Sequence, residues 1–439
     1  MIIYNEKEMV FDHAITPIMA SNLCNDEKCV VLYESENEIS VACGCYISIV
    51  VSASKIQIRS KTNYQEIVVN DLCYDLEKAL SSIAIKDWRM YGWGNFSLAR
   101  YTYGLNIDKE DEELFCFFIP EKEYRIVNNM VTLRAIEKKS LPLMKECIGR
   151  VFIQPEYNLN AVVNPIEIIN SDEDYYKNIV SKAISEIKGE KYQKIILSRK
   201  VVVDKRLDMK KTYISGRKVN TPAYSYYVNF RGLEIVGFSP ETVAEVDHDG
   251  YVSTFPLAGT RALTDNDVRN RELRDELLHD TKEIAEHAVS VQLANQEMQS
   301  ICDNETVVIT DFMSVMERGT VQHLGSRLKG KLKENKNAWH ALSTLFPAVT
   351  ASGIPKKEAI EAIGRIEKEA RGLYSGSILI YDSEGVMDAA LVLRTIFQSE
   401  KETWVRVGAG IVELSKPDRE FTETQEKVSC IANQLILAE

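Results

Sequence analysis

The order of strand and helix patterns along residues 171–439 constrains the fold more than any other feature of the sequence. Patterns typical of strands recur at 191–203, 224–230 and 234–238 before a long helical pattern begins over 267–300. A regular alternation of strand and helix would indicate a parallel sheet, whereas strands grouped in this way are typical of antiparallel sheets. The order therefore predicts an α+β fold.

Residues 1–170 carry a different pattern, with short strands, turns and no grouping of side chains that suggests catalysis. The clearest strand patterns are 29–33, 47–52 and 125–133. A connection over 155–174, interrupted by Pro165, leads into an amphipathic helical pattern at 175–188. We therefore place a boundary near residue 170. After it we also expect helices at 339–346, 356–365 and 418–437, and strands at 375–381, 387–398 and 403–410.

The charge balance and the cysteines exclude several classes of function. The net charge is −12, from 53 Lys and Arg against 65 Asp and Glu, which argues against a nucleic-acid-binding surface. No apolar run reaches the roughly 18 residues of a membrane span, and the first residues do not resemble a signal peptide, so we expect a cytoplasmic protein. The nine cysteines contain no CxxC pair, which favours free thiols in a reducing compartment.

Two pairs of glutamates repeat one helical spacing. Glu283 and Glu286 lie three positions apart, and Glu420 and Glu423 repeat that spacing near the start of the last predicted helix. Taken alone, such a pair most often belongs to a solvated helix face. If the two faces met, the four carboxylates would repel one another unless a hard cation such as Mg²⁺ lay between them. The adjacent His287 creates a partial zinc motif, but the first histidine of that motif is missing, which disfavours zinc.

Lys194 and Glu241 are candidates for acid–base chemistry. Lys194 lies within an apolar strand pattern, where partial desolvation would favour the neutral amine that a general base requires. The alternative is an edge-strand lysine that points to solvent, which the strand alone favours. Glu241 follows a strand pattern at a turn, and it could serve as the paired acid or could cap a helix.

Other candidate residues are ambiguous when each is considered alone. The glycines Gly408 and Gly410 lack the third glycine of a dinucleotide-binding motif, although they could let backbone N–H groups approach a carboxylate. Arg394 lies deep in an apolar pattern and needs an anionic partner, either a bound carboxylate or a structural Asp or Glu. His323 could bond to a substrate, but a lone histidine is usually structural. Tyr374 and Thr350 are equally ambiguous.

Taken together, these segments resemble the chorismate-utilising enzymes, which include anthranilate synthase large components, aminodeoxychorismate synthase, isochorismate synthases and salicylate synthases. The resemblance spans residues 192–429. Its motifs are the strand around Lys194, 238–241 (Phe-Ser-Pro-Glu), 256–261 (Pro-Leu-Ala-Gly-Thr-Arg), 282–287 (Lys-Glu-Ile-Ala-Glu-His), 321–326 (Val-Gln-His-Leu-Gly-Ser), 346–356, 371–376 (Arg-Gly-Leu-Tyr-Ser-Gly), 408–410 and 419–423. So many motifs in the order of the family make chance agreement negligible.

The resemblance implies a single α+β domain over residues 1–439, in which two large antiparallel sheets pack together with helices outside. The N-terminal portion, 1–170, would contribute strands, and the C-terminal portion, 171–439, would carry the site. The resemblance also implies that Mg²⁺ bridges Glu286 and Glu423 to the ring carboxylate of chorismate. Glu283 and Glu420 would support the metal through water.

The resemblance assigns further roles around the substrate. The side chains and backbone expected to hold the substrate carboxylates are Tyr374, Arg394, Gly408 and Lys427, and those expected to line the ring are Gly259 and Thr260. The expected catalytic residues are Lys194, Glu241, His323 and Thr350.

Three positions bear on which reaction of the family is catalysed. Members that use ammonia lack a lysine at the position of Lys194, so water is the expected nucleophile. Isochorismate synthases typically have a small apolar residue where this chain has Thr350, and phenylalanine where it has Tyr374. The segment 346–353 is closest to salicylate synthases of siderophore pathways. We therefore expect Mg²⁺-dependent conversion of chorismate to salicylate and pyruvate through isochorismate.

Three alternatives remain open from the sequence. The chain could stop at isochorismate, it could be an amidotransferase-dependent subunit, which Lys194 disfavours, or it could bind chorismate without catalysis. We expect no glutamine amidotransferase subunit, no nucleic-acid partner and no membrane partner. The expected assembly is a monomer or a homodimer.

Overall fold

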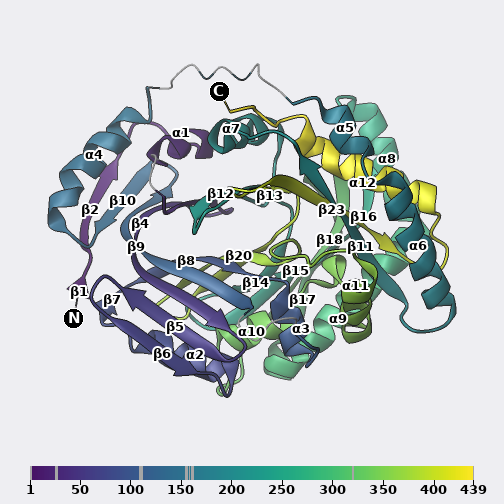
Figure 1. Ribbon diagram of the computed structural model, residues 1–439, viewed down its shortest axis with the longest axis horizontal. Helices are drawn as coiled ribbons and strands as arrows, with labels where there is room; N and C mark the ends of the chain where they lie inside the picture. Colours follow the sequence, from purple (N-terminus) through teal and green to yellow (C-terminus); the bar gives the residue numbers. More distant parts are fainter. Residues whose placement is uncertain are drawn as a thin grey trace.

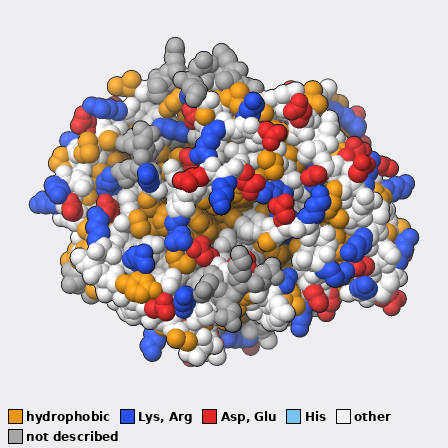
Figure 2. Space-filling view, in the orientation of Figure 1, with side chains coloured by type: hydrophobic (Ala, Val, Ile, Leu, Met, Phe, Trp, Pro, Cys, Tyr) orange, Lys and Arg blue, Asp and Glu red, His pale blue; other side chains and the backbone are white. Residues whose placement is uncertain are grey.

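A computed structural model describes residues 2–24, 28–107, 112–153, 157, 159, 163–318 and 321–438. The connection predicted over 155–174 lies partly outside these residues. No described helix combines the length and the apolar character that a membrane span requires. On the face drawn in Figure 2, basic and acidic side chains are interspersed.

The strands form one extensive antiparallel network. They are β1 (Ile2–Ile3), β2 (Asn5–Val10), β3 (Val30–Glu34), β4 (Ile39–Ser52), β5 (Lys55–Ser60), β6 (Tyr64–Val68), β7 (Ile85–Lys86), β8 (Arg89–Gly94), β9 (Glu113–Val127), β10 (Met130–Ala135), β11 (Lys194–Val203), β12 (Tyr224–Phe230), β13 (Leu233–Ser239), β14 (Thr242–Val246), β15 (Tyr251–Phe255), β16 (Leu257–Ala262), β17 (Val308–Arg318), β18 (Val321–Lys331), β19 (Gly353–Ile354), β20 (Ser377–Asp382), β21 (Met387–Leu391), β22 (Thr395–Gln398) and β23 (Thr403–Ile411). Apart from the short parallel pair β1–β7, the described strands join into a single closed sheet.

Helices cover the outside of this sheet (Figure 1). They are α1 (Pro17–Ala20), α2 (Leu72–Ser81), α3 (Ser97–Thr102), α4 (Leu141–Arg150), α5 (Pro165–Asn170), α6 (Glu173–Lys188), α7 (Met209–Val219), α8 (Asp267–His279), α9 (Thr281–Ile301), α10 (Ala338–Leu345), α11 (Lys356–Ile366) and α12 (Pro417–Ala432). The described residues also form short 3₁₀ helices, which include η4 (Val349–Ala351). The α+β class and the antiparallel pairing predicted from the sequence are confirmed.

The buried hydrophobic side chains form three clusters. Successive side chains of a strand point to opposite faces, so a single strand contributes to an inner cluster and to an outer one. One cluster contains strand and loop residues without helical ones and fills the interior of the closed sheet. Two others combine strand residues with helical residues and form the outer layers. Along β9, Phe118 faces the interior, Phe117 faces one outer layer and Tyr124 faces the other. The long strand β9 therefore contributes side chains to the inner cluster and to both outer clusters.

The two portions of the chain share strands. β3 pairs with β12 and β8 pairs with β20, each in antiparallel register. Figure 1 accordingly shows the purple and blue strands of the N-terminal portion continuing into the green and yellow strands of the C-terminal portion. The functional boundary near residue 170 stays a prediction.

Two elements predicted as single units are divided in the structure. The strand predicted over 125–133 is a hairpin, since β9 ends at Val127 and β10 begins at Met130. Asn128, with φ of 57°, forms the turn, and asparagine tolerates this left-handed conformation better than most residues. The helix predicted over 267–300 is broken at Asp280, whose side chain caps α9 by accepting from the N–H groups of Lys282 and Glu283.

The strand predicted over 387–398 is also wrong as a single element. β21 ends at Leu391, β22 begins at Thr395, and between them Arg394 has φ of 49°. The carbonyl of Arg394 accepts from the N–H of Phe238, 3.2 Å away. This long-range bond to β13 accompanies a backbone conformation that the local sequence pattern does not predict.

A buried ion-pair network joins the end of α11 to β23 in the C-terminal portion. Glu367, with a side chain 1% exposed, accepts from Arg371 and Arg406 at 2.8 Å each and also from Ser198. We expect Glu367→Ala to lower the free energy of unfolding by about 3–5 kcal/mol, because two buried guanidinium groups would lose their counter-ion. Denaturant unfolding measures this loss, and Glu272→Ala, which breaks an exposed pair with Arg269, is the control. Equal losses in the two variants would contradict the prediction.

Candidate active site

A cavity of about 950 Å³ opens between β11, β16, β18 and β23 of the sheet and helices α9 and α12. All the site residues predicted from the sequence line it: Lys194, Glu241, Gly259, Thr260, Glu283, Glu286, His323, Thr350, Tyr374, Arg394, Gly408, Glu420, Glu423 and Lys427. The structure thus brings the predicted residues together, and their chemical roles stay proposals.

Lys194 is the first residue of β11 and lies inside the protein. Its strand pairs with β19 on one side and with β23 on the other, so β11 is not an edge strand. The side chain is 6% exposed, and Nζ lies 2.5 Å from Oε1 of Glu286. The alternative of a solvent-facing edge lysine is therefore wrong. The amine therefore contacts one of the glutamates predicted to hold a metal.

Glu241 is a buried carboxyl group on the cavity wall. It precedes β14, so the alternative of a helix cap is wrong. Burial raises its pKa to about 8, against the opposing effects of hydrogen bonds from Thr350 and the backbone of Leu257. The hydroxyl of Thr350 donates to Oε1 at 2.7 Å. Near neutral pH this carboxyl group therefore carries its proton and can act as a general acid.

The two glutamate pairs face the same cavity from α9 and α12. Glu286 contacts Lys194, and Glu423 accepts from Lys427 at 2.7 Å. Among the described residues, no three acidic, histidine or cysteine side chains are gathered at ligating distance. The predicted pairs are therefore near one another without forming a compact ligand set in this arrangement.

The electrostatics of these carboxyl groups nevertheless fit a cation. Burial and the neighbouring Glu286 raise the pKa of Glu283, and burial and the neighbouring Glu423 raise that of Glu420. Glu420 is 4% exposed, and its Oε2 is buried without a hydrogen-bond partner in the described part of the chain. An unsatisfied buried carboxylate oxygen beside other carboxylates is suited to a hard cation.

His323 links β16 to Arg394. Its Nε2 lies 3.1 Å from Nη2 of Arg394, and its Nδ1 lies 3.1 Å from Oγ1 of Thr260 and 3.3 Å from the carbonyl of Gly259. Because the guanidinium can only donate, Nε2 accepts and Nδ1 carries the proton. His323 is therefore held as one neutral tautomer.

Arg394 lies in a different environment from the one expected. It is half-buried instead of deeply buried, and it occupies the break between β21 and β22. Its left-handed backbone is unfavourable for a side chain with a Cβ, and such strain is most often retained at functional sites. The guanidinium lines the cavity and bonds to His323.

The glycines on the cavity wall allow close approaches. Gly259 has φ of 78°, and a Cβ there would lie 3.2 Å from Oε2 of Glu283. A Cβ on Gly408 would lie 2.5 Å from the carbonyl oxygen of Leu197 on the neighbouring strand, which requires glycine for packing. The carbonyl of Gly408 accepts from Nζ of Lys427 at 3.3 Å.

Sequence reasoning missed the ion pairs of Arg261, a residue that lines the cavity. Nη2 of Arg261, at the end of β16, lies 2.5 Å from Oδ2 of Asp280, and Nη1 lies 3.4 Å from Oε1 of Glu283. Asp280 thus caps α9 and binds Arg261 at the same time. An acidic residue three positions before Glu283 is a typical helix-start signal, which could have located this contact.

The sequence pattern of the chorismate binding enzymes matches residues 28–433, so the chain belongs to this family. It is 48% identical to the salicylate synthase of Mycolicibacterium paratuberculosis over 82% of this chain and 79% of the relative. It is also 34% identical to the anthranilate synthase component 1 of Acetivibrio thermocellus, over 60% of this chain and 52% of that protein.

Solved structures share the fold. Anthranilate synthase component I of Streptococcus pneumoniae matches with a TM-score of 0.74 and 23% identity, over 98% of this chain and 100% of that one. A putative 2,3-dihydroxybenzoate-specific isochorismate synthase of Bacillus anthracis matches with a TM-score of 0.72 and 21% identity, over 95% and 99%. These matches confirm the predicted fold.

Proposed function

We propose that the protein is a salicylate synthase, which converts chorismate to salicylate and pyruvate through isochorismate. The observation that carries this proposal is the placement of Lys194 and the protonated Glu241 on the wall of one cavity, in a chain 48% identical to a salicylate synthase. We further propose that it acts in the cytoplasm, supplies a siderophore pathway and needs no amidotransferase subunit.

In the first step, Lys194 takes a proton from water as the water oxygen bonds to C2 of chorismate. The double bonds shift, and the C4–O bond breaks. Glu241 gives its proton to the departing C4 hydroxyl, which leaves as water, so the product isochorismate is an isomer of chorismate. Burial of Glu241 supports this role because it keeps the acid protonated near neutral pH.

In the second step, the C2 hydrogen moves to the methylene carbon of the enolpyruvyl group while the C3–O bond breaks. This transfer releases pyruvate and leaves the aromatic ring of salicylate, so it needs orientation of the side chain and no additional base. Tyr374, Arg394 and Lys427 line the cavity and are proposed to hold the carboxylates of the substrate in that orientation.

We propose that Mg²⁺ is held by Glu286 and Glu423, with Glu283 and Glu420 in support. When bound, it supplies positive charge that neutralises the ring carboxylate of the substrate. Glu286 also lies 2.5 Å from Nζ of Lys194, so the proposed metal site adjoins the proposed base. The unpartnered Oε2 of Glu420 supports this assignment.

Product identification tests the proposed function. Purified protein with chorismate and MgCl₂ is expected to form salicylate and pyruvate in equal amounts, and ammonium is expected to have no effect. EDTA is expected to stop turnover, and excess MgCl₂ to restore it, because four glutamates that face one cavity need a counter-ion. Chromatography with salicylate fluorescence measures the products. Isochorismate as the final product would support the alternative isochorismate synthase, and ammonium-dependent anthranilate would reject both.

A further inference from the structure

Arg371 lies in the wall behind the active-site cavity and does not line that cavity. Its side chain is 1% exposed, and both of its terminal nitrogens bond to backbone or side-chain oxygens of other segments. Nη1 donates to the carbonyl of Ala351 at 2.7 Å and to Oγ of Ser375 at 3.2 Å, and Nη2 donates to the carbonyl of Ile196 at 2.6 Å. One guanidinium therefore joins three separate segments.

Each of these segments carries a site residue. Ala351 follows Thr350, Ser375 follows Tyr374, and Ile196 lies two positions after Lys194 on β11. The guanidinium carbon also lies 5.7 Å from the ring centre of Tyr374. Arg371 thus contacts the residues that directly follow Thr350 and Tyr374. By resemblance, these two positions distinguish salicylate formation from isochorismate formation.

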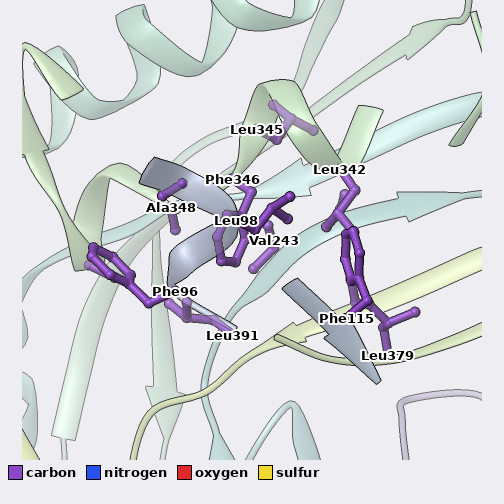
Figure 3. Close-up of a cluster of buried hydrophobic side chains, with 14 of the residues drawn as sticks. Phe96, Leu98, Phe115, Val243, Leu342, Leu345, Phe346, Ala348, Leu379 and Leu391 are labelled. Atoms are coloured by element: carbon purple, nitrogen blue, oxygen red, sulfur yellow. The ribbon is translucent and has the colours of Figure 1, made fainter. Parts of the chain in front are cut away.

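Arg371 is itself firmly held. Both oxygens of Glu367 accept from it, at 2.8 and 3.1 Å, and its guanidinium carbon lies 4.7 Å from the ring centre of Phe96. Phe96 belongs to the buried cluster of Figure 3, together with Ala348, which starts the turn leading to Thr350. The orientation of Arg371 is therefore fixed by both charge and packing.

The residues of the first chemical step do not depend on Arg371 to the same degree. Lys194 is fixed by ladder bonds of β11 to β19 and β23 and by Glu286. Glu241 keeps a backbone hydrogen bond at Leu257 besides the one from Thr350. In contrast, Thr350 lies in the short helix η4, and Tyr374 lies in a turn before β20, so neither position is held by a strand ladder.

From these contacts we propose that Arg371 is a positioning residue for the second step, the loss of pyruvate from isochorismate. The inference rests on the function proposed above. Arg371 holds the backbone beside Thr350 and Tyr374 so that isochorismate is kept in the orientation required for hydrogen transfer. A small displacement is enough to slow a reaction that depends on orientation.

The test is Arg371→Lys, which keeps the charge and loses the planar fork of donors. Chorismate and isochorismate are supplied separately, and kcat and KM are measured for each. With isochorismate we expect kcat to fall by about tenfold or more, since misplacement by about 1 Å can cost about 10²-fold. Chorismate consumption is expected to stay near the wild-type rate, so isochorismate accumulates in the mixture.

The matched control is Arg365→Lys. Arg365 also makes a two-pronged bond to a carboxylate, Glu186, at 2.6 and 2.8 Å, but it lies away from the cavity. Arg365→Lys is expected to leave the rates of both steps and the product ratio unchanged. Ser375→Ala, which removes one acceptor of Arg371, is expected to shift the product ratio in the same direction as Arg371→Lys and by less.

Three results would overturn the inference: an unchanged product ratio in Arg371→Lys, an equal loss in both steps, or loss of folded protein in Arg371→Lys with an unchanged ratio in Ser375→Ala. Failure of the proposed function has a different signature. In that case the wild-type protein itself would not convert isochorismate to salicylate.

Discussion

Replacement of Lys194 by glutamine is expected to remove the formation of both isochorismate and salicylate from chorismate. Glutamine is similar in length and can occupy the same position on β11, but it cannot accept a proton from water. Loss of a general base typically costs about 10²- to 10⁴-fold in rate. Steady-state kinetics with chromatographic detection of both products measures the loss.

Two comparisons make the result specific to the base role. The first is Lys200→Gln. Lys200 lies on the same strand, its Nζ contacts Glu369 and Glu402, and it does not line the cavity. This variant is expected to keep normal turnover. Lys194→Gln supplied with isochorismate is expected to keep forming salicylate, because the second step needs no base. Normal turnover of chorismate by Lys194→Gln would exclude Lys194 as the base.

Replacement of Glu241 by glutamine is expected to have a comparable effect through loss of the acid. The amide oxygen can still accept from Thr350, so the local structure should persist, but the amide cannot protonate the departing hydroxyl. We expect chorismate turnover to fall by about 10²- to 10⁴-fold. Conversion of supplied isochorismate should be nearly unaffected, and a loss in that step as well would indicate a structural effect.

The pH profile gives an independent test of Glu241. Its reactive form carries the proton, so activity on chorismate is present below its pKa and is lost as the pH rises through about 8. Salicylate formation from isochorismate should lack this alkaline decline. A decline centred near the usual pKa of a glutamate, about 4.3, would contradict the proposed acid.

The sequence predicted the composition of the site better than its geometry. The spacing of Glu283 with Glu286, and of Glu420 with Glu423, indicates which side of each helix matters. It does not indicate that the two sides meet, because that depends on how α9 and α12 pack against the sheet. The same limit applies to Lys194, whose burial depends on pairing with β19, more than 150 residues further along the chain.

The structural breaks were the least predictable features. Residues 387–398 have the pattern of a single strand, whereas the left-handed conformation of Arg394 accompanies a bond to the distant Phe238. Arg371 belongs to the family motif at 371–376, yet its contact with Ile196 spans 175 residues of sequence. Local propensity contains no information on contacts of this kind.

The sharing of strands between the two portions limits how this chain can be shortened. None of the described residues that line the cavity precedes Lys194, so the described part of the first 170 residues contributes no side chain to it. Yet removing them would leave β12 and β20 with rows of unpaired N–H and C=O groups, which are templates for aggregation. The N-terminal portion therefore serves the site as scaffold, and its sequence is free to diverge as long as its strands keep their register.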